Sequence, residues 1–329
     1  MVRFALLSAT LPLALAVVLA GCGVDEPPAE SPDRAPDWLA ELQRHDPLTE
    51  PQGFSLFGDP LMAQVDEEGR IAAADEALAA DPSDPDLLIA AGRERRHSWQ
   101  YAPAIELYTR AIEVAPDDWR PWRFRGHRHL SLRNFDGAIS DLERARELAP
   151  MNWDVAYHLA LAYFVAGDHE AAANEYLRCL ALADDEDARA AEAPGFRSCS
   201  ANADDEESLV AMAEWTVRAL MRTGRDEEAQ ALLDEIPDDL EITTNIAYWE
   251  NLRLHKGLVE EEVLLDPGED AGYRLETVGF GVANRWLAQG DTARAVELLD
   301  RLMEDEWWPG FGRIAAEAEL WRIRGEGGS

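Results

Sequence analysis

Three prolines stand 34 residues apart in this chain: Pro82, Pro116 and Pro150. Each one follows a stretch whose apolar residues recur with the period of an α-helix. An internal period of this length is typical of a repeat array, in which each unit buries its apolar face only against its neighbours. The period therefore predicts one continuous array of helices in place of independent domains.

Small and bulky residues keep the same period between the prolines. Ala104, Ala138 and Ala172 align, as do Tyr108, Leu142 and Tyr176, and Gly92 and Gly126 with Ala160. Small residues let two helices approach closely, and the bulky ones fill the space between them. A proline ends the second helix of each pair because it cannot continue the hydrogen-bond ladder.

This arrangement resembles the tetratricopeptide repeat, with its W-x2-L-G-x2-Y, A-x3-F and closing P. The resemblance is close over residues 85 to 184, and it predicts repeats at 85–118, 119–152 and 153–186. Arg95 and His129 depart from the motif because they replace its Tyr, and Asp184 replaces the last proline. The resemblance implies an all-α fold, a solenoid of antiparallel helix pairs, over residues 59–329.

Weaker signals extend the array in both directions, and no alternating strand pattern of useful length interrupts them. One helix is expected between residues 60 and 80. Turns at Gly224 and Gly290 repeat the turn at Gly167. They predict degenerate repeats over 205–304, with helices at about 206–222, 226–236, 275–288 and 292–304, a less regular pair within 241–265, and a cap at 308–324.

An acidic insertion at 184–204 interrupts the array. Its carboxylates lack the spacing of a calcium loop, so a solvated loop is the simpler interpretation. Cys199 lies in this insertion, and Cys179 lies in the helix before it. Outside the cytoplasm the two could form a disulfide, whereas Cys179 alone would fit as a buried free thiol.

The first 21 residues look like a signal peptide: Arg3 is followed by an apolar run that is short for a membrane span. The run ends in Leu-Ala-Gly before Cys22, which resembles a bacterial lipobox. The resemblance implies a lipid on Cys22; the alternative is an ordinary signal peptide with an incidental cysteine. Gly23 in place of Asp favours the periplasmic face of the outer membrane, and the proline-rich stretch 22–58 is expected to be a tether.

The chain carries 65 Asp and Glu against 30 Lys and Arg, for a net charge of −35. This acidity excludes a general nucleic-acid binder, since the chain would repel phosphates, and the 47% share of hydrophobic residues excludes a disordered chain. Residues 93–133 are the exception, because they hold nine arginines and five acids.

In the repeat family, fixed positions of each first helix line a concave groove. Here the resemblance places the following groove residues: Arg93, Arg96, His97, Arg120, Arg123, His127, Tyr157 and Phe164. Arginines suit carboxylates, so the groove could hold an acidic or C-terminal peptide segment, with an apolar side chain against the two aromatic residues. Alternatively, the arginines pair with acids of neighbouring helices.

No catalytic motif, cofactor loop or metal-ligand spacing is found, and His127 and His129 are spaced for opposite sides of a helix. An enzyme is therefore not expected. The resemblance implies a lipid-anchored periplasmic scaffold or adaptor that binds a protein partner. The alternative is a solenoid that binds a small ligand or saccharide.

Overall fold

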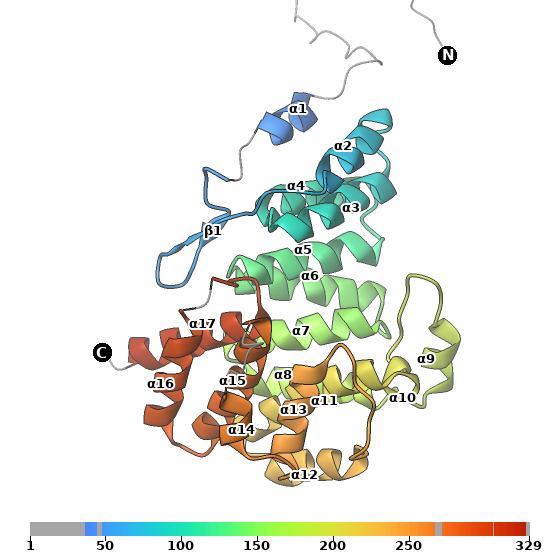
Figure 1. Ribbon diagram of the computed structural model, residues 1–329. Helices are drawn as coiled ribbons and strands as arrows, with labels where there is room; N and C mark the ends of the chain where they lie inside the picture. Colours follow the sequence, from blue (N-terminus) through green and yellow to red (C-terminus); the bar gives the residue numbers. More distant parts are fainter. Residues whose placement is uncertain (1–36, 45–47, 267–271, 305, 327–329) are drawn as a thin grey trace, which may run out of the picture. The chain divides into compact units, whose positions relative to one another are not determined.

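The computed structural model describes residues 37–44, 48–266, 272–304 and 306–326, all within the compact unit Ala35–Ser329. The signal peptide at 1–21, Cys22 and the start of the tether lie outside these residues. Seventeen α-helices make up nearly all of the described secondary structure (Figure 1). The predicted all-α solenoid is confirmed. No helix in the described ranges is long and apolar enough to cross a membrane.

Part of the stretch assigned to the tether is folded. The amphipathic helix α1 (Asp37–Arg44) buries Leu39 in a cluster with Leu78 and Leu88. A short antiparallel hairpin follows, formed by β1 (Gly53–Phe54) and β2 (Pro60–Leu61), whose two-residue strands are too short to leave a sequence pattern. The packed apolar face of α1 explains why the folded region begins before residue 59.

The leading helix is shorter than expected. Helix α2 (Arg70–Ala80) begins ten residues after the predicted start at residue 60. The side chain of Asp66 accepts hydrogen bonds from the backbone N–H groups of Arg70 and Ile71, at 3.2 and 2.8 Å. These bonds satisfy donors that a helix start leaves unpaired, so they fix the beginning of α2.

Three regular helix pairs follow. They are α3 (Pro85–Glu94) with α4 (Tyr101–Val114), α5 (Trp119–Ser131) with α6 (Phe135–Leu148), and α7 (Trp153–Ala166) with α8 (His169–Leu180), and the 3-10 helix η1 (Arg95–Ser98) extends α3. Asp84, Asp118 and Asn152 cap the three first helices through their side chains. Successive helices pack against one another from α3 to α8. The pairs therefore stack in the order that the repeat period predicts.

The acidic insertion contains two short helices, α9 (Glu186–Ala191) and α10 (Ala201–Asp204). Two backbone hydrogen bonds of 2.8 Å, Trp153 N–H to Arg197 O and Cys199 N–H to Met151 O, join the insertion to the start of α7. A disulfide joins Cys199 to Cys179 of α8, with the sulfur atoms 2.05 Å apart. The insertion is thus fixed at both sides of the third repeat.

The C-terminal half contains α11 (Glu206–Arg222), α12 (Asp226–Glu235), α13 (Ile246–His255), α14 (Glu261–Leu265), α15 (Gly272–Ala288), α16 (Thr292–Leu302) and α17 (Phe311–Glu326). Helix α11 packs on α8, α13 and α15 pack on α11, and α16 packs on α15. Their bounds agree closely with the helices expected in the degenerate repeats.

Helix α17 does more than cover the final repeat. It packs against α15 and α16, and it also reaches back to α7 of the third repeat (Figure 1). The guanidinium of Arg322 donates a 2.7 Å hydrogen bond to the carbonyl of Val165 at the end of α7. The C-terminal half therefore covers part of the face that the sequence resemblance treats as an open groove.

Candidate functional site

Most of the clustered arginines serve the fold. Arg95, Arg125 and Arg133 form short ion pairs with acids that are almost completely buried. The partners are Asp75 at 2.8 Å, Asp141 at 2.7 Å and Glu317 at 2.7 Å. Arg110 pairs with Glu106, and Arg120 pairs with Asp86 and Asp118. For these five residues, pairing with acids of the chain itself accounts for the positive charge.

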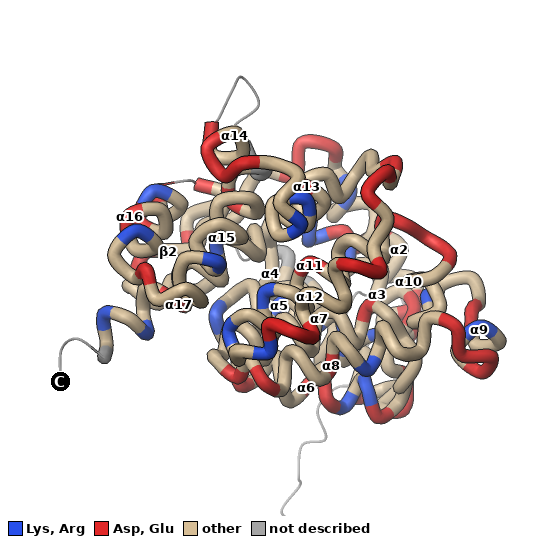
Figure 2. The backbone as a smooth tube through the Cα atoms, turned by 90° about the horizontal axis from the view of Figure 1, so that it is seen from below, with Lys and Arg blue, Asp and Glu red and all other residues tan. Residues whose placement is uncertain are grey.

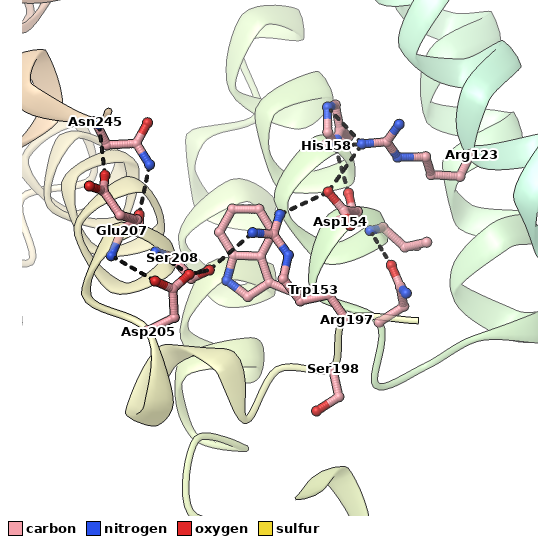
Figure 3. Close-up of polar contacts among 12 residues, drawn as sticks. Arg123, Trp153, Asp154, His158, Arg197, Ser198, Asp205, Glu207, Ser208 and Asn245 are labelled. Atoms are coloured by element: carbon pink, nitrogen blue, oxygen red, sulfur yellow. Dashed lines mark hydrogen bonds and ion pairs between the residues drawn. The ribbon is translucent and has the colours of Figure 1, made fainter. Parts of the chain in front are cut away.

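Arg123 joins α5 to α7 and to the insertion. Its Nη2 atom lies 3.2 Å from Oδ1 of Asp154, and Nη2 of Arg197 lies 3.0 Å from the same oxygen (Figure 3). Burial opposes ionisation of Asp154, but the two guanidiniums outweigh it and hold the pKa of this carboxyl below its usual value. Arg123 is therefore occupied by a carboxylate of the chain.

The two aromatic groove residues lie inside the core. Tyr157 stacks on Trp153, with ring centroids 4.9 Å apart, and its hydroxyl donates a 3.1 Å hydrogen bond to the hydroxyl of Tyr248. Phe164 is fully buried between Trp215 and Phe280. The expectation that Tyr157 and Phe164 receive an apolar side chain of a ligand is corrected, because α11, α13 and α15 supply the groups that contact them.

His127 is covered by the beginning of α17. Its ring lies 5.2 Å from Phe311 and 4.3 Å from the ring of His158. Burial holds the pKa of His127 well below its usual value, and the nearby Arg128 guanidinium lowers it further. His127 is thus a neutral side chain at the edge of the covered region.

His129 belongs to another environment. Its Nε2 atom lies 3.7 Å from a carboxylate oxygen of Asp141, and burial lowers its pKa. No group of three or more metal-ligating side chains occurs among the residues with described placement. His127 and His129 thus have separate surroundings, as their spacing predicts.

A second set of cations lacks carboxylate partners. Arg93 and Arg96 are exposed, whereas Arg128 is 7% exposed, with its guanidinium 4.2 Å from the ring centroid of Tyr101. None of the three forms an ion pair with a carboxylate in the described part of the chain. Figure 2 shows the basic positions along α5 and acidic stretches at α9 and α14.

Arg96, His97 and Arg128 line a pocket of about 500 Å³. One wall comes from η1, α4 and α5, and the other comes from the start of α13, α15 and the loop before α17. The aromatic lining residues are Trp99, Tyr101, Tyr248, Trp307 and Phe311, with His127 beside them. The described polar residues between them include Ser131, Thr244, Asn245 and Glu276.

Sequence reasoning placed Arg96 and His97 of this pocket in the groove, but it did not assign Arg128 to it and missed the aromatic walls. Trp99 and Tyr101 are close in sequence to Arg96, so their place in one wall of the pocket could have been noticed. Trp307 and Phe311 are about 210 residues further along the chain, and only the return of α17 brings them to α5. No local pattern carries that long-range contact.

Comparison with known proteins supports the repeat assignment in the most regular region. Residues 125–191 match a family model described as the tetratricopeptide repeat. A crystal structure of MamA is 19% identical to this chain. The match covers 58% of this chain and 91% of the MamA chain, with a TM-score of 0.41. The structure of YrrB, described as a TPR protein with an unusual peptide-binding site, is 14% identical. The match covers 76% of this chain and 99% of the YrrB chain, with a TM-score of 0.41. The stacked helix pairs show an all-α solenoid, and within it residues 125–191 are similar to the tetratricopeptide repeat.

Proposed function

We propose that this chain is a protein-interaction scaffold that is anchored by a lipid on Cys22 and faces the periplasm from the outer membrane. The repeat architecture supports the scaffold role, because stacked helix pairs present a broad surface on which partners bind. We assign the chain no catalytic activity, and this stays a prediction.

One observation carries the choice of partner surface. Arg93 and Arg96 are exposed, and neither has a carboxylate partner in the described ranges. A guanidinium fork binds carboxylates through two parallel hydrogen bonds, so an acidic segment of a partner protein suits this surface. Because the groove positions of the third repeat are buried, the contact is confined to the first two repeats.

Charge reversal tests this surface. Arg93→Glu combined with Arg96→Glu is expected to abolish co-purification of the partner from detergent-solubilised membranes, because both guanidiniums then become carboxylates. Arg144→Glu is the matched control, since Arg144 lies on α6 and its side chain is 39% exposed. If the double variant keeps its partner, or if the control loses it equally, the proposed surface is wrong.

The anchor has its own test. Two or three acyl chains hold a protein on a bilayer far more firmly than one does. Cys22→Ser is expected to move the protein from the membrane pellet to the supernatant after cell fractionation. A variant that stays in the outer-membrane fraction would refute the lipid anchor while leaving the scaffold proposal standing.

A further inference from the structure

We propose that the pocket lined by Arg96, Arg128 and the aromatic residues at the start of α17 binds a small organic carboxylate whose anionic group is carried on a flat apolar ring. This goes beyond the scaffold role, because it gives the same solenoid a small-molecule ligand. The argument combines the size of the pocket, its charge and its walls.

The size fits a small molecule. Ligand pockets in proteins commonly have volumes of about 300–1,000 Å³, and this one has about 500 Å³. A long peptide would need the groove to continue along α7. There Leu161 and Val165 are at most 1% exposed, covered by the chain's own core. The space is therefore suited to a short ligand.

The charge points to an anion. Arg128 is 93% buried, and no carboxylate in the described ranges pairs with it. A buried charge without a counter-charge is costly, and a ligand carboxylate would offset that cost. Arg96 lines the same pocket from η1, so two guanidiniums are available to one anionic group. Paired, charge-assisted hydrogen bonds of this kind are among the strongest in proteins.

Glu276 is the only carboxylate among the described lining residues, and it is committed to the fold. Glu276 accepts hydrogen bonds from the backbone N–H of Arg313, at 2.8 Å, and from the hydroxyl of Thr277, at 3.0 Å. Gly312 gives it room, since a Cβ at that position would lie 2.2 Å from Oε2 of Glu276. Glu276 thus fixes the start of α17, while Arg96 and Arg128 remain available to an anionic ligand.

The walls fit a flat ring. Trp99 and Trp307 meet edge to face, with ring centroids 5.2 Å apart, and Tyr101 and Phe311 complete the apolar lining. Aromatic rings prefer offset-stacked or edge-to-face neighbours, which favours a planar ligand over a branched one. Trp307 is 44% exposed, so it stands at the pocket with much of its ring uncovered. A ring that slides beside it would bury apolar surface that water now contacts.

The binding test uses a matched pair of probes, 2-naphthoate and the neutral 2-naphthalenemethanol. Titration calorimetry with the full chain, together with quenching of tryptophan fluorescence, measures the two affinities. The naphthoate is expected to bind at least about tenfold more tightly, because its carboxylate accepts charge-assisted hydrogen bonds that the neutral alcohol cannot form. Equal affinities, or no binding of the naphthoate at about 1 mM, would overturn the proposal.

Two variants locate the binding. Arg128→Gln and Arg96→Gln are each expected to weaken naphthoate binding about tenfold and to leave binding of the neutral probe unchanged. Arg144→Gln on α6 is the matched control and should bind as the unmodified chain does. Circular dichroism checks that each variant is folded; if Arg128→Gln is not, the exposed Arg96 decides alone. An Arg96→Gln variant that binds the naphthoate normally would contradict the assignment.

Discussion

Arg133, two residues after the end of α5, and Glu317, on α17, form an ion pair with their side chains 2% and 0% exposed, although 184 residues separate them. The Nη2 atom of Arg133 lies 2.7 Å from Oε2 of Glu317, and the other carboxylate oxygen accepts from the backbone N–H of Leu56. This contact joins the hairpin, the second repeat and the last helix. It therefore ties α17 to the second repeat and to the hairpin.

Breaking this pair should destabilise the whole fold. Glu317→Gln keeps the shape of the side chain but leaves the Arg133 guanidinium buried without its counter-charge. Removing one partner of a buried ion pair typically costs about 3–5 kcal/mol. The variant is expected to lose about that much free energy of unfolding, measured by urea denaturation.

An exposed ion pair between α17 and α16 provides the control. Arg324 and Asp300 have side chains 46% and 47% exposed. Asp300→Asn should cost less than about 1 kcal/mol, because solvent screens exposed ion pairs. If the two variants lose equal stability, the buried pair does not have the structural role that its burial indicates.

The fold was largely predictable because its determinants are local. Gly92 and Gly126 carry no side chain where one would meet Tyr108 or Leu142, and the caps Asp84 and Asp118 directly precede their helices. Such signals repeat within one period of the sequence. The place where α1 docks was not predictable, because its packing depends on contacts with helices further along the chain.

The candidate site shows the same limit for charges. Arg95 and Arg96 are neighbours in sequence, yet Arg95 is buried against Asp75 while Arg96 is exposed and lines the pocket. The 3-10 geometry of η1 and the position of α2 determine which of the two side chains is buried and which is exposed. Sequence alone can count the cations of 93–133, but it cannot say which of them already have a partner.

The disulfide should stabilise the third repeat. Cys179 and Cys199 are 20 residues apart and fully buried, and closing a loop of this length contributes about 3 kcal/mol in the chain-entropy account. In a Cys22→Ser background, Cys199→Ala is expected to lower the free energy of unfolding by about that amount. Reductant should lower the free energy of unfolding of the Cys22→Ser protein by the same amount and leave that of the Cys199→Ala variant unchanged. If reductant does not change the unfolding of the Cys22→Ser protein, the disulfide does not stabilise the fold.

Close helix packing makes Gly126 intolerant of a side chain. A Cβ there would lie 2.7 Å from Cγ of Leu142 and 3.2 Å from the carbonyl oxygen of Ala138. Gly126→Ala is expected to cost about 1–3 kcal/mol through overpacking, in spite of the better helix propensity of alanine. Gly325→Ala on α17, where a Cβ would meet nothing within 4 Å, should be neutral or stabilising by up to about 1 kcal/mol in the same denaturation assay.

Glu207 should make stability depend on acidic pH. Its carboxylate accepts hydrogen bonds from the backbone N–H groups of Thr243, Thr244 and Asn245, at 2.6, 3.0 and 2.8 Å, and Asn245 lies beside it in Figure 3. Burial opposes ionisation, but these bonds outweigh it and lower the pKa of Glu207 to about 2 from an ordinary value of 4.5. The stabilisation is complete above pH 4.5 and is lost as the pH falls toward 2.

Glu207→Gln removes the carboxylate and keeps the shape of the side chain. At pH 7 the variant is expected to be less stable by about 1–2 kcal/mol, a value discounted because the side chain is partly exposed. The difference should shrink between pH 4.5 and 2 in urea unfolding followed by circular dichroism. Glu206→Gln is the control, since Glu206 accepts one backbone bond, from Glu241. Thr244 and Asn245 line the pocket, so Glu207→Gln should also bind 2-naphthoate more weakly than the unmodified chain does. If Glu207→Gln is as stable as the unmodified chain at pH 7, the Glu207 carboxylate does not hold the 243–245 loop.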